Sequence, residues 1–213
     1  MKKKNITLIF SSLLFIIFIS GIYAHCTPRY YELTHNMSEI LLFSTNIFVL
    51  AWYFIEKFHW KTLLWSILLL LITFGIEAYG VASGNVFGEY QYGAVFSFQI
   101  LDVPVLIALN WIVLTMAAAN IGKKMVKNPY LAALIGGVMV LIFDIIMEPV
   151  AISLDYWKWE APNVPLQNYL AWFLIGTIGS FVLLRLGKMR NCQLLKAYFF
   201  AQLLFFLGVN FCI

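Results

Sequence analysis

The chain has 213 residues, of which 62% are hydrophobic and only 11% are charged, and its mean hydropathy is +0.87. Because a soluble domain of this length carries about 25% charged residues, the composition excludes an ordinary soluble globular protein and favours a polytopic membrane protein. The net charge of +4 is not a nucleic-acid-binding signal; what matters is where the charges fall.

Seven apolar runs are long enough to cross a bilayer, which takes about 20 mostly apolar residues. In chain order these runs cover residues 5–24, 37–57, 60–80, 99–121, 130–154, 168–187 and 194–213. The basic start of the chain could belong to a secretory signal, but the residues before Ala24 make a poor cleavage site, so we expect an uncleaved first helix. Residues 1–213 are therefore predicted to form one polytopic membrane domain, an all-α bundle of seven transmembrane helices.

The basic residues predict the orientation of these helices. With the N-terminus in the cytoplasm, twelve of the fourteen Lys and Arg residues fall at cytoplasmic helix ends, as the positive-inside rule requires. These twelve are Lys2, Lys3, Lys4, Lys57, Lys61, Lys123, Lys124, Lys127, Arg185, Lys188, Arg190 and Lys196. Only Arg29 and Lys158 fall on the other side, so we expect a multi-pass protein of the cell (inner) membrane with a cytoplasmic N-terminus.

Carboxyl groups converge on the leaflet opposite the cytoplasm. Glu77 lies near the outer end of the third run, and Asp144 and Glu148 lie in the outer half of the fifth. Residues four apart share a helix face, so Asp144 and Glu148 point the same way, as do Asn168 and Trp172 at the start of the sixth run. Such acids sometimes only pair across helices, but several converging inside a membrane indicate a functional site. We predict Glu77, Asp144 and Glu148 to be catalytic.

Two prolines and two outer loops complete the predicted site. Pro104 and Pro149 are expected to kink the fourth and fifth helices beside carboxylates, and Asp102 fits a helix cap as well as an acid. The loops at about 81–98 and 155–167 are both rich in aromatic residues. Glycines in the first loop favour a lid or cavity wall, whereas the tryptophans of the second fit an interfacial belt equally well.

Metal, nucleotide and disulfide sites receive little support. Carboxylate-rich bundles can bind divalent cations. We expect His25 and His35 in the first outer loop and His59 in an inner turn, away from the acids, so no metal site is predicted. No phosphate-binding glycine loop or dinucleotide fingerprint appears. The three cysteines, Cys26, Cys192 and Cys212, lie mostly in or beside apolar runs, and we interpret them as small apolar side chains.

The expected chemistry is therefore acid–base conversion of a lipid-soluble substrate without a cofactor. A carboxylic acid in an apolar pocket keeps its proton near neutral pH, and aromatic faces stabilise a carbocation. Together these features suit protonation of an isoprenoid double bond.

At these residues the chain resembles the membrane-integral carotenoid biosynthesis family. The resemblance rests on GIEAYGVASGNVFGEYQYG (75–93), LDVPVLIALNW (101–111), GGVMVLIFDIIMEPVA (136–151) and DYWKWEAPNVPLQNYLAW (155–172). It places the catalytic core at about 75–172, whereas the flanking spans match only in hydropathy. The fifth-span motif of the family usually reads Asp-x-x-x-Asp-Pro, and here Glu148 replaces the second acid, which bears on the identity of the substrate. Ser83 stands where the family commonly has threonine.

Characterised members of that family are carotenoid 1,2-hydratases acting on gamma-carotene, lycopene or bisanhydrobacterioruberin end groups. The resemblance implies hydration of a terminal C1=C2 double bond to a tertiary alcohol. We expect Asp144 first and Glu148 second to protonate C2, and Glu77 to act as base toward water. The candidate substrate-binding residues are Tyr79, Asn85, Tyr90, Tyr92, Asp102, Asn110, Trp111, Trp157, Trp159, Asn168 and Trp172. The expected partners are a carotenoid, the lipid bilayer and other carotenoid-pathway enzymes, with no nucleic acid.

Two other functions stay open at this point. Cyclisation or isomerisation of the same end group would use the same acid and aromatics but would exclude water, whereas Asn85, Asn110 and Asn168 favour a water-holding site. A carotenoid carrier or a proton-coupled transporter would also suit seven spans. The acids, however, gather in one leaflet instead of forming a relay across the bilayer.

Overall fold

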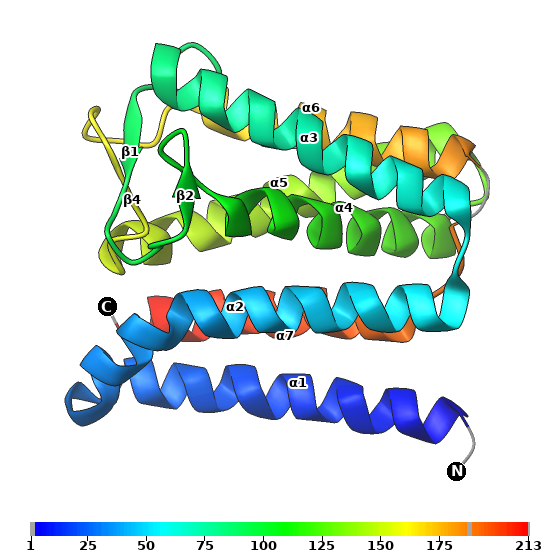
Figure 1. The fold of residues 1–213 in the computed structure, drawn as a ribbon, viewed down its shortest axis with the longest axis horizontal. Coiled ribbons are helices and arrows are strands. Elements are labelled where there is room, and N and C mark those ends of the chain that lie inside the picture. The colour runs from blue at the N-terminus through cyan, green and yellow to red at the C-terminus, as the bar shows by residue number, and fades with distance from the viewer. Residues whose placement is uncertain (1–2, 187–188, 213) are drawn as a thin grey trace.

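The computed structural model describes residues 3–186 and 189–212, and their helices run side by side along one long axis (Figure 1). The helices are α1 (Lys3–His25), α2 (Pro28–Lys57), α3 (Trp60–Ser83), α4 (Val105–Met125), α5 (Pro129–Ser153), α6 (Leu166–Arg185) and α7 (Gln193–Asn210). All seven of these described helices are long and apolar enough to cross a membrane. The prediction of an all-α membrane protein with a seven-helix bundle is confirmed.

The second helix is longer than the hydropathy pattern predicted. It begins at Pro28, in the first helical position after the extended residue Thr27, where proline costs no hydrogen bond. The polar turns that follow are compatible with a helix but too polar to count as a membrane span. The expectation that His25 and His35 lie in an outer loop is wrong, because His25 is the last residue of α1 and His35 lies within α2.

The fourth helix begins later than predicted. Pro104 was expected to kink this helix, but it precedes α4 and occupies the N-cap position. Asp102 is therefore not the cap of this helix; it lies in an exposed turn with a positive φ of 60°. Pro149, in contrast, lies inside α5 as the sequence indicated.

The centre of the bundle is α4, which contacts α2, α3, α5, α6 and α7. Small residues let helices α5 and α6 approach closely beside it. A Cβ added at Gly176 would lie 2.9 Å from the Val140 side chain, and one at Gly136 would lie 2.6 Å from the Ser180 hydroxyl. These glycines fix the relative position of the two helices.

The expectation that all three cysteines are small apolar side chains is wrong for two of them. A disulfide joins Cys26, just after α1, to Cys212, just after α7, with 5.4 Å between their Cα atoms. A separation of 186 residues hides this pairing in the sequence, but α1 packs against α7 along the bundle. Cys192 is free and buried.

The two loops that the sequence predicted as irregular pair with each other. Strand β1 (Tyr90–Tyr92) runs antiparallel to β4 (Trp157–Trp159), with Tyr90 opposite Trp159 and Tyr92 opposite Trp157. Because side chains alternate along a strand, these four aromatics face inward while the residues between them are exposed. A short hairpin of β2 (Gln99–Ile100) and β3 (Val103–Pro104) lies nearby. We call this end of the bundle the sheet end.

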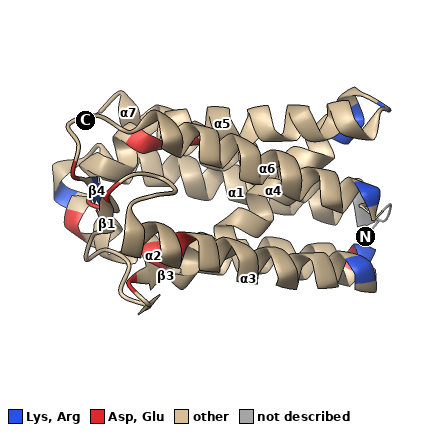
Figure 2. Ribbon diagram, turned by 90° about the horizontal axis from the view of Figure 1, so that it is seen from above, with Lys and Arg blue, Asp and Glu red and all other residues tan. Residues whose placement is uncertain are grey.

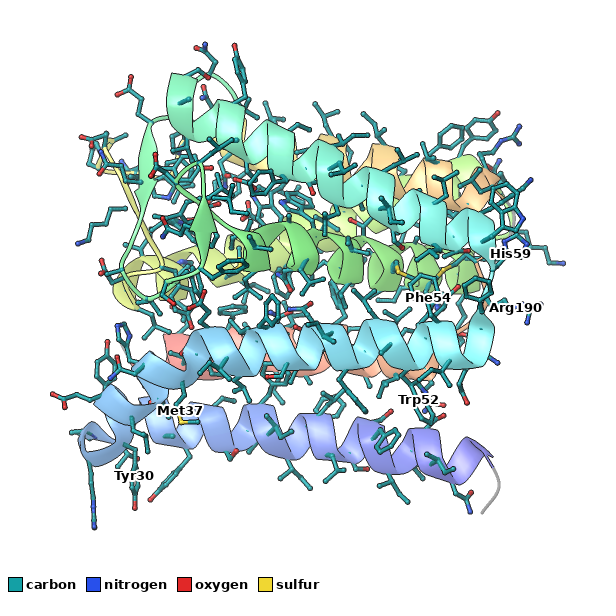
Figure 3. All side chains as sticks on the ribbon, in the orientation of Figure 1. Tyr30, Met37, Trp52, Phe54, His59 and Arg190 are labelled. Carbon is teal, nitrogen blue, oxygen red and sulfur yellow. A yellow bond between two sulfur atoms is a disulfide. The ribbon has the colours of Figure 1, made fainter. Side chains whose placement is uncertain are left out.

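The charges separate along the bundle. Figure 2 shows most Lys and Arg residues at the end opposite the sheets, here called the basic end, and most Asp and Glu residues in the other half. In Figure 3, His59 and Arg190 mark the basic end, whereas Tyr30 and Met37 lie toward the sheet end. Lys2 and Lys188, which the orientation argument used, lie outside the described residues. The charge separation agrees with the predicted orientation, but which end faces the cytoplasm stays a prediction.

Candidate active site

Glu77 lies near the sheet end of α3, and only 3% of it is exposed. Its carboxylate accepts three hydrogen bonds from three aromatic side chains. The hydroxyls of Tyr90 and Tyr92 donate to Oε2 at 2.7 and 2.9 Å, and the Trp111 indole N–H donates to Oε1 at 3.0 Å. These donors occupy both oxygens of the carboxylate and hold it in one orientation.

The two acids of α5 are linked through one amide. Nδ2 of Asn168, on α6, donates to Asp144 Oδ2 at 2.9 Å and to Glu148 Oε1 at 3.1 Å. The other oxygen of Glu148 accepts indole N–H groups from Trp157 and Trp159, each at 3.1 Å. Oδ1 of Asp144 is buried and has no hydrogen-bond partner within the described part of the chain. Glu148 is therefore held by three donors and Asp144 by one.

A small cavity lies between these two groups. Its volume is about 40 Å³, room for roughly three water molecules at about 10–15 Å³ each. The lining residues are Glu77, Phe87, Tyr90, Tyr92, Ile107, Asn110, Met147, Glu148, Trp157, Trp159, Asn168 and Trp172. Trp172 also packs against Trp111, with 4.2 Å between ring centroids and an angle of 31° between the ring planes. The site thus combines two buried carboxyl groups, an aromatic wall and space for water.

The β1 tyrosines separate this cavity from a larger polar hollow at the sheet end. The hollow has a volume of about 590 Å³, and Tyr90 and Tyr92 line both spaces. Burial, and then the adjacent Glu77 carboxylate, raise the pKa of both phenols above the usual value. Both tyrosines therefore stay neutral hydrogen-bond donors at physiological pH.

Comparison with known proteins assigns the chain to a family. The sequence model of the carotenoid biosynthesis protein family matches residues 37–213. The chain belongs to this family. The match includes the segment 75–172 that carried the resemblance and extends over most of α2 and the whole of α7. No solved structure matches this carotenoid biosynthesis protein.

A relative of this carotenoid biosynthesis protein is bisanhydrobacterioruberin hydratase from Haloarcula japonica. The two sequences are 27% identical over 157 residues, which cover 67% of this chain and 54% of the relative. The chain thus spans about half the length of the relative that it matches.

The fold of this carotenoid biosynthesis protein brings most predicted site residues together. Those that line the cavity or hydrogen-bond to a residue that lines it are Glu77, Tyr90, Tyr92, Asn110, Trp111, Asp144, Glu148, Trp157, Trp159, Asn168 and Trp172. Three others lie apart from it: Tyr79 is 57% exposed on α3, Asn85 is exposed in the loop, and Asp102 is exposed beside the polar hollow. Helical spacing relates residues on one helix to each other but does not fix which face meets the cavity.

Three apolar lining residues, Phe87, Ile107 and Met147, were not among the predicted site residues, although Phe87 belongs to the loop that we predicted to form a lid or cavity wall. Apolar residues in apolar runs carry no mark that separates a cavity wall from a lipid-facing surface. Phe87 had an indirect signal, because Gly80 lies under it: a Cβ at Gly80 would come 2.8 Å from the Phe87 ring. The loop glycines Gly84 and Gly88 adopt positive φ values of 66° and 116°, which turn the chain from α3 toward β1.

The site offers groups for proton transfer rather than a recognisable set of metal ligands. Within residues 3–186 and 189–212, no group of three or more His, Cys, Asp and Glu side chains is arranged to hold a metal ion. The donors to Glu77 and Glu148 are phenol, indole and amide groups. These neutral donors can stabilise negative charge on a carboxylate while it gives or takes a proton.

Proposed function

We propose that this carotenoid biosynthesis protein is a carotenoid 1,2-hydratase, which adds water across the terminal C1=C2 double bond of an acyclic carotenoid end group. The observation that carries the proposal is that Glu77 and Glu148, from different helices, line one water-sized cavity with an aromatic wall. The relative named a bisanhydrobacterioruberin hydratase supports the same class of reaction. The protein carries out this reaction with its own side chains.

Glu148 delivers the proton, with Asp144 behind it. Because only Glu148 of the two lines the cavity, we propose the reverse of the order expected from the sequence. Two carboxyl groups bridged by one amide in a buried site cannot readily both be ionised, so the pair shares a proton. The proton passes to C2 of the substrate, the electron pair of the double bond forms the new C–H bond, and C1 becomes a tertiary cation.

Aromatic rings surround the cation as it forms. The rings of Tyr90 and Trp159 lie 5.1 Å apart and those of Tyr92 and Trp157 lie 6.2 Å apart, centroid to centroid. Their faces carry the negative part of the ring quadrupole, which attracts a cation. As Glu148 loses its proton, the indole N–H groups of Trp157 and Trp159 stabilise the charge left on Oε2.

Glu77 acts as the base. A water molecule in the cavity attacks C1, its oxygen forms the C–O bond, and Glu77 takes the proton that the water loses. The substrate has then gained one water, while Glu77 holds a proton and the Asp144–Glu148 pair has lost one. Proton transfer through cavity water restores the starting state. The polar hollow beyond Tyr90 and Tyr92 supplies further water.

Substrate binding requires the cavity to widen. A volume of about 40 Å³ holds only a few waters, so an isoprenoid end group displaces both water and aromatic walls. The β1–β4 sheet is the element positioned to move, because it contributes four of the aromatic lining residues and is joined to the helices by loops. Lid movements of this kind commonly accompany substrate binding.

The same proposal includes the setting of the enzyme. We place the basic end in the cytoplasm, so that the active site lies toward the non-cytoplasmic leaflet of the cell membrane. Residues 1–213 act as one domain with its catalytic core at about 75–172, and other carotenoid-pathway enzymes are the proposed neighbours. Cyclisation or isomerisation is less well supported, because both reactions require that water is excluded from the carbocation. The polar hollow beside the site would admit water.

Product analysis tests the reaction. The chain is expressed in cells that make lycopene or gamma-carotene, and a product heavier by one water is expected. Glu77→Gln and Glu148→Gln should reduce its formation by roughly a hundredfold or more, the size of a lost acid or base. Glu160→Gln, an exposed acid beside the polar hollow, is the matched control and should keep full activity.

Other outcomes would replace the proposal. A product of unchanged mass but altered absorption would indicate cyclisation or isomerisation. Pigment that co-purifies without conversion would indicate a carrier. Full hydration by Glu77→Gln would show that another group is the base.

A further inference from the structure

An apolar groove runs along the outside of the bundle between α3 and α6. Its volume is about 360 Å³, and its walls consist almost entirely of aliphatic side chains. They include Leu64, Leu68 and Ile72 from α3 and Ile175, Ile178 and Val182 from α6. Most of these side chains are exposed at the surface that would face lipid.

The faces of α3 and α6 that carry the groove also carry residues of the candidate active site, closer to the sheet end. On α3, Leu69, Thr73 and Glu77 follow each other at four-residue intervals, so the groove wall continues into the catalytic face. On α6, Gly179 lies two turns from Trp172 on the same face. The Trp65 indole N–H donates to the Gly179 carbonyl at 3.1 Å, bridging the two helices within the groove.

The groove has the length and the chemistry to hold a rod-shaped hydrocarbon. From Leu64 to Ile76 it follows α3 for about 18 Å, at roughly 1.5 Å per residue. The hydrocarbon core of a bilayer is about 30 Å thick. A rod whose end lies beside Glu77 would therefore follow the groove across more than half of that thickness.

We infer that the α3–α6 groove binds the polyene chain of the carotenoid and so holds its end group between Glu77 and Trp172. This inference rests on the proposed function and adds the site that selects a long, straight substrate. Aliphatic walls match a polyene, which has no polar groups to satisfy. The apolar contact along the groove supplies binding energy far from the reacting carbons, which positions the end group.

A second apolar hollow, between α1 and α2, is a less suitable path. Its volume is about 410 Å³, but a small cavity that contains three amide side chains, Asn46, Asn110 and Gln202, lies between it and the active site. Asn46 Oδ1 and Gln202 Oε1 in that cavity are buried and have no hydrogen-bond partner among the described residues. A hydrocarbon passing there would cover both oxygens and leave them without water.

Cysteine protection tests where the polyene binds. Ile72→Cys places a thiol in the groove, and Leu71→Cys places one beside it on the same helix but outside the groove. The wild-type side chains are similarly exposed, at 56% and 59%. Both variants are made in a Cys192→Ser background, reconstituted in phosphatidylcholine vesicles and labelled with a lipid-soluble maleimide. With lycopene at about ten times its dissociation constant, labelling in the groove should slow by roughly tenfold, with little change outside it.

A second pair of variants tests substrate length. Ile178→Trp fills the groove, whereas Leu174→Trp, one turn away and outside it, is the control. The groove variant should raise KM for a full-length acyclic carotenoid by roughly tenfold, the effect of losing about 1.4 kcal/mol of binding. It should leave KM nearly unchanged for a short acyclic isoprenoid with the same end group, because that substrate does not reach the groove.

The outcomes separate this inference from the proposed reaction. Protection of Ile72→Cys without any hydrated product supports the groove and overturns the hydratase. Hydrated product with equal labelling of the Ile72→Cys and Leu71→Cys thiols overturns the groove and keeps the hydratase. Protection of a thiol introduced at Leu41, in the α1–α2 hollow, in place of Ile72 also overturns it.

Discussion

Replacing Asn168 tests the link between the two acids of α5. Its amide donates to Asp144 at 2.9 Å and to Glu148 at 3.1 Å, and the residue is 2% exposed. Asn168→Leu keeps a similar volume but removes both N–H donors. The proposed reaction places negative charge on Glu148 in the transition state, so the lost donor matters more there than in the resting enzyme.

The size of the effect follows from the kind of hydrogen bond. A hydrogen bond to a charged group contributes about 1.5–3 kcal/mol, which corresponds to a roughly 13- to 160-fold loss in rate. Since Trp157 and Trp159 still donate to Glu148, some activity should survive. We expect kcat to fall by this factor while KM for the carotenoid changes little.

The assay is the initial rate of hydrated carotenoid formation in reconstituted vesicles. The matched control is Gln167→Leu, which removes the amide of the adjacent, exposed residue that donates to the Gly84 carbonyl. Both variants are checked for folding by size-exclusion chromatography. If Asn168→Leu keeps its rate within about threefold of the wild type, less than 1 kcal/mol, the bridging amide has no role in proton transfer.

Three further predictions concern ionisation, packing and covalent structure. The raised pKa values of Tyr90 and Tyr92 keep both phenols protonated beyond the usual tyrosine range near pH 10. The tyrosinate absorbance gained between pH 9 and 10.5 should therefore be the same in the wild type and in the double variant Tyr90→Phe/Tyr92→Phe. A smaller rise in the double variant would contradict the burial of the two phenols. Gly176→Val should destabilise the bundle by about 1–3 kcal/mol, because the new side chain would clash with Val140 on α5. Gly75→Ala should be tolerated, because a Cβ there meets nothing within 4 Å. The thermal unfolding midpoint of each variant measures the difference. Reduction of the Cys26–Cys212 disulfide should change the gel mobility of the wild type, and Cys26→Ser should abolish this change. If reduction does not alter the mobility of the wild type, the disulfide is absent.

Membrane insertion and the identity of the acids could be predicted from the sequence because both depend on local properties. The energy of placing a helix in a bilayer is largely a sum over its own residues, so the apolar runs located all seven helices. A carboxyl group in such a run is costly wherever the helix packs, which singled out Glu77, Asp144 and Glu148. Their four-residue spacing placed Asp144 and Glu148 on one face, and one amide reaches both in the structure.

The partners of those acids depend on contacts between distant segments. Tyr90 and Trp159 come into register only when β1 pairs with β4, and neither loop carries a pattern strong enough to predict a strand. The exposure of Tyr79, two residues from buried Glu77, reflects the rotation of α3 about its axis. That rotation is decided by packing against α4 and α6, not by spacing along the helix.

The sequence by itself thus determined that the chain spans a membrane, which family it belongs to and which carboxyl groups lie in apolar runs, where their burial is costly. Only the tertiary structure decided that phenol and indole donors hold Glu77 and Glu148 around one cavity. It also decided that Asp144 does not line that cavity and that an apolar groove lies between α3 and α6. The reason is physical: insertion and burial costs belong to single residues, whereas hydrogen bonds, cavities and grooves exist only between segments that the fold brings together.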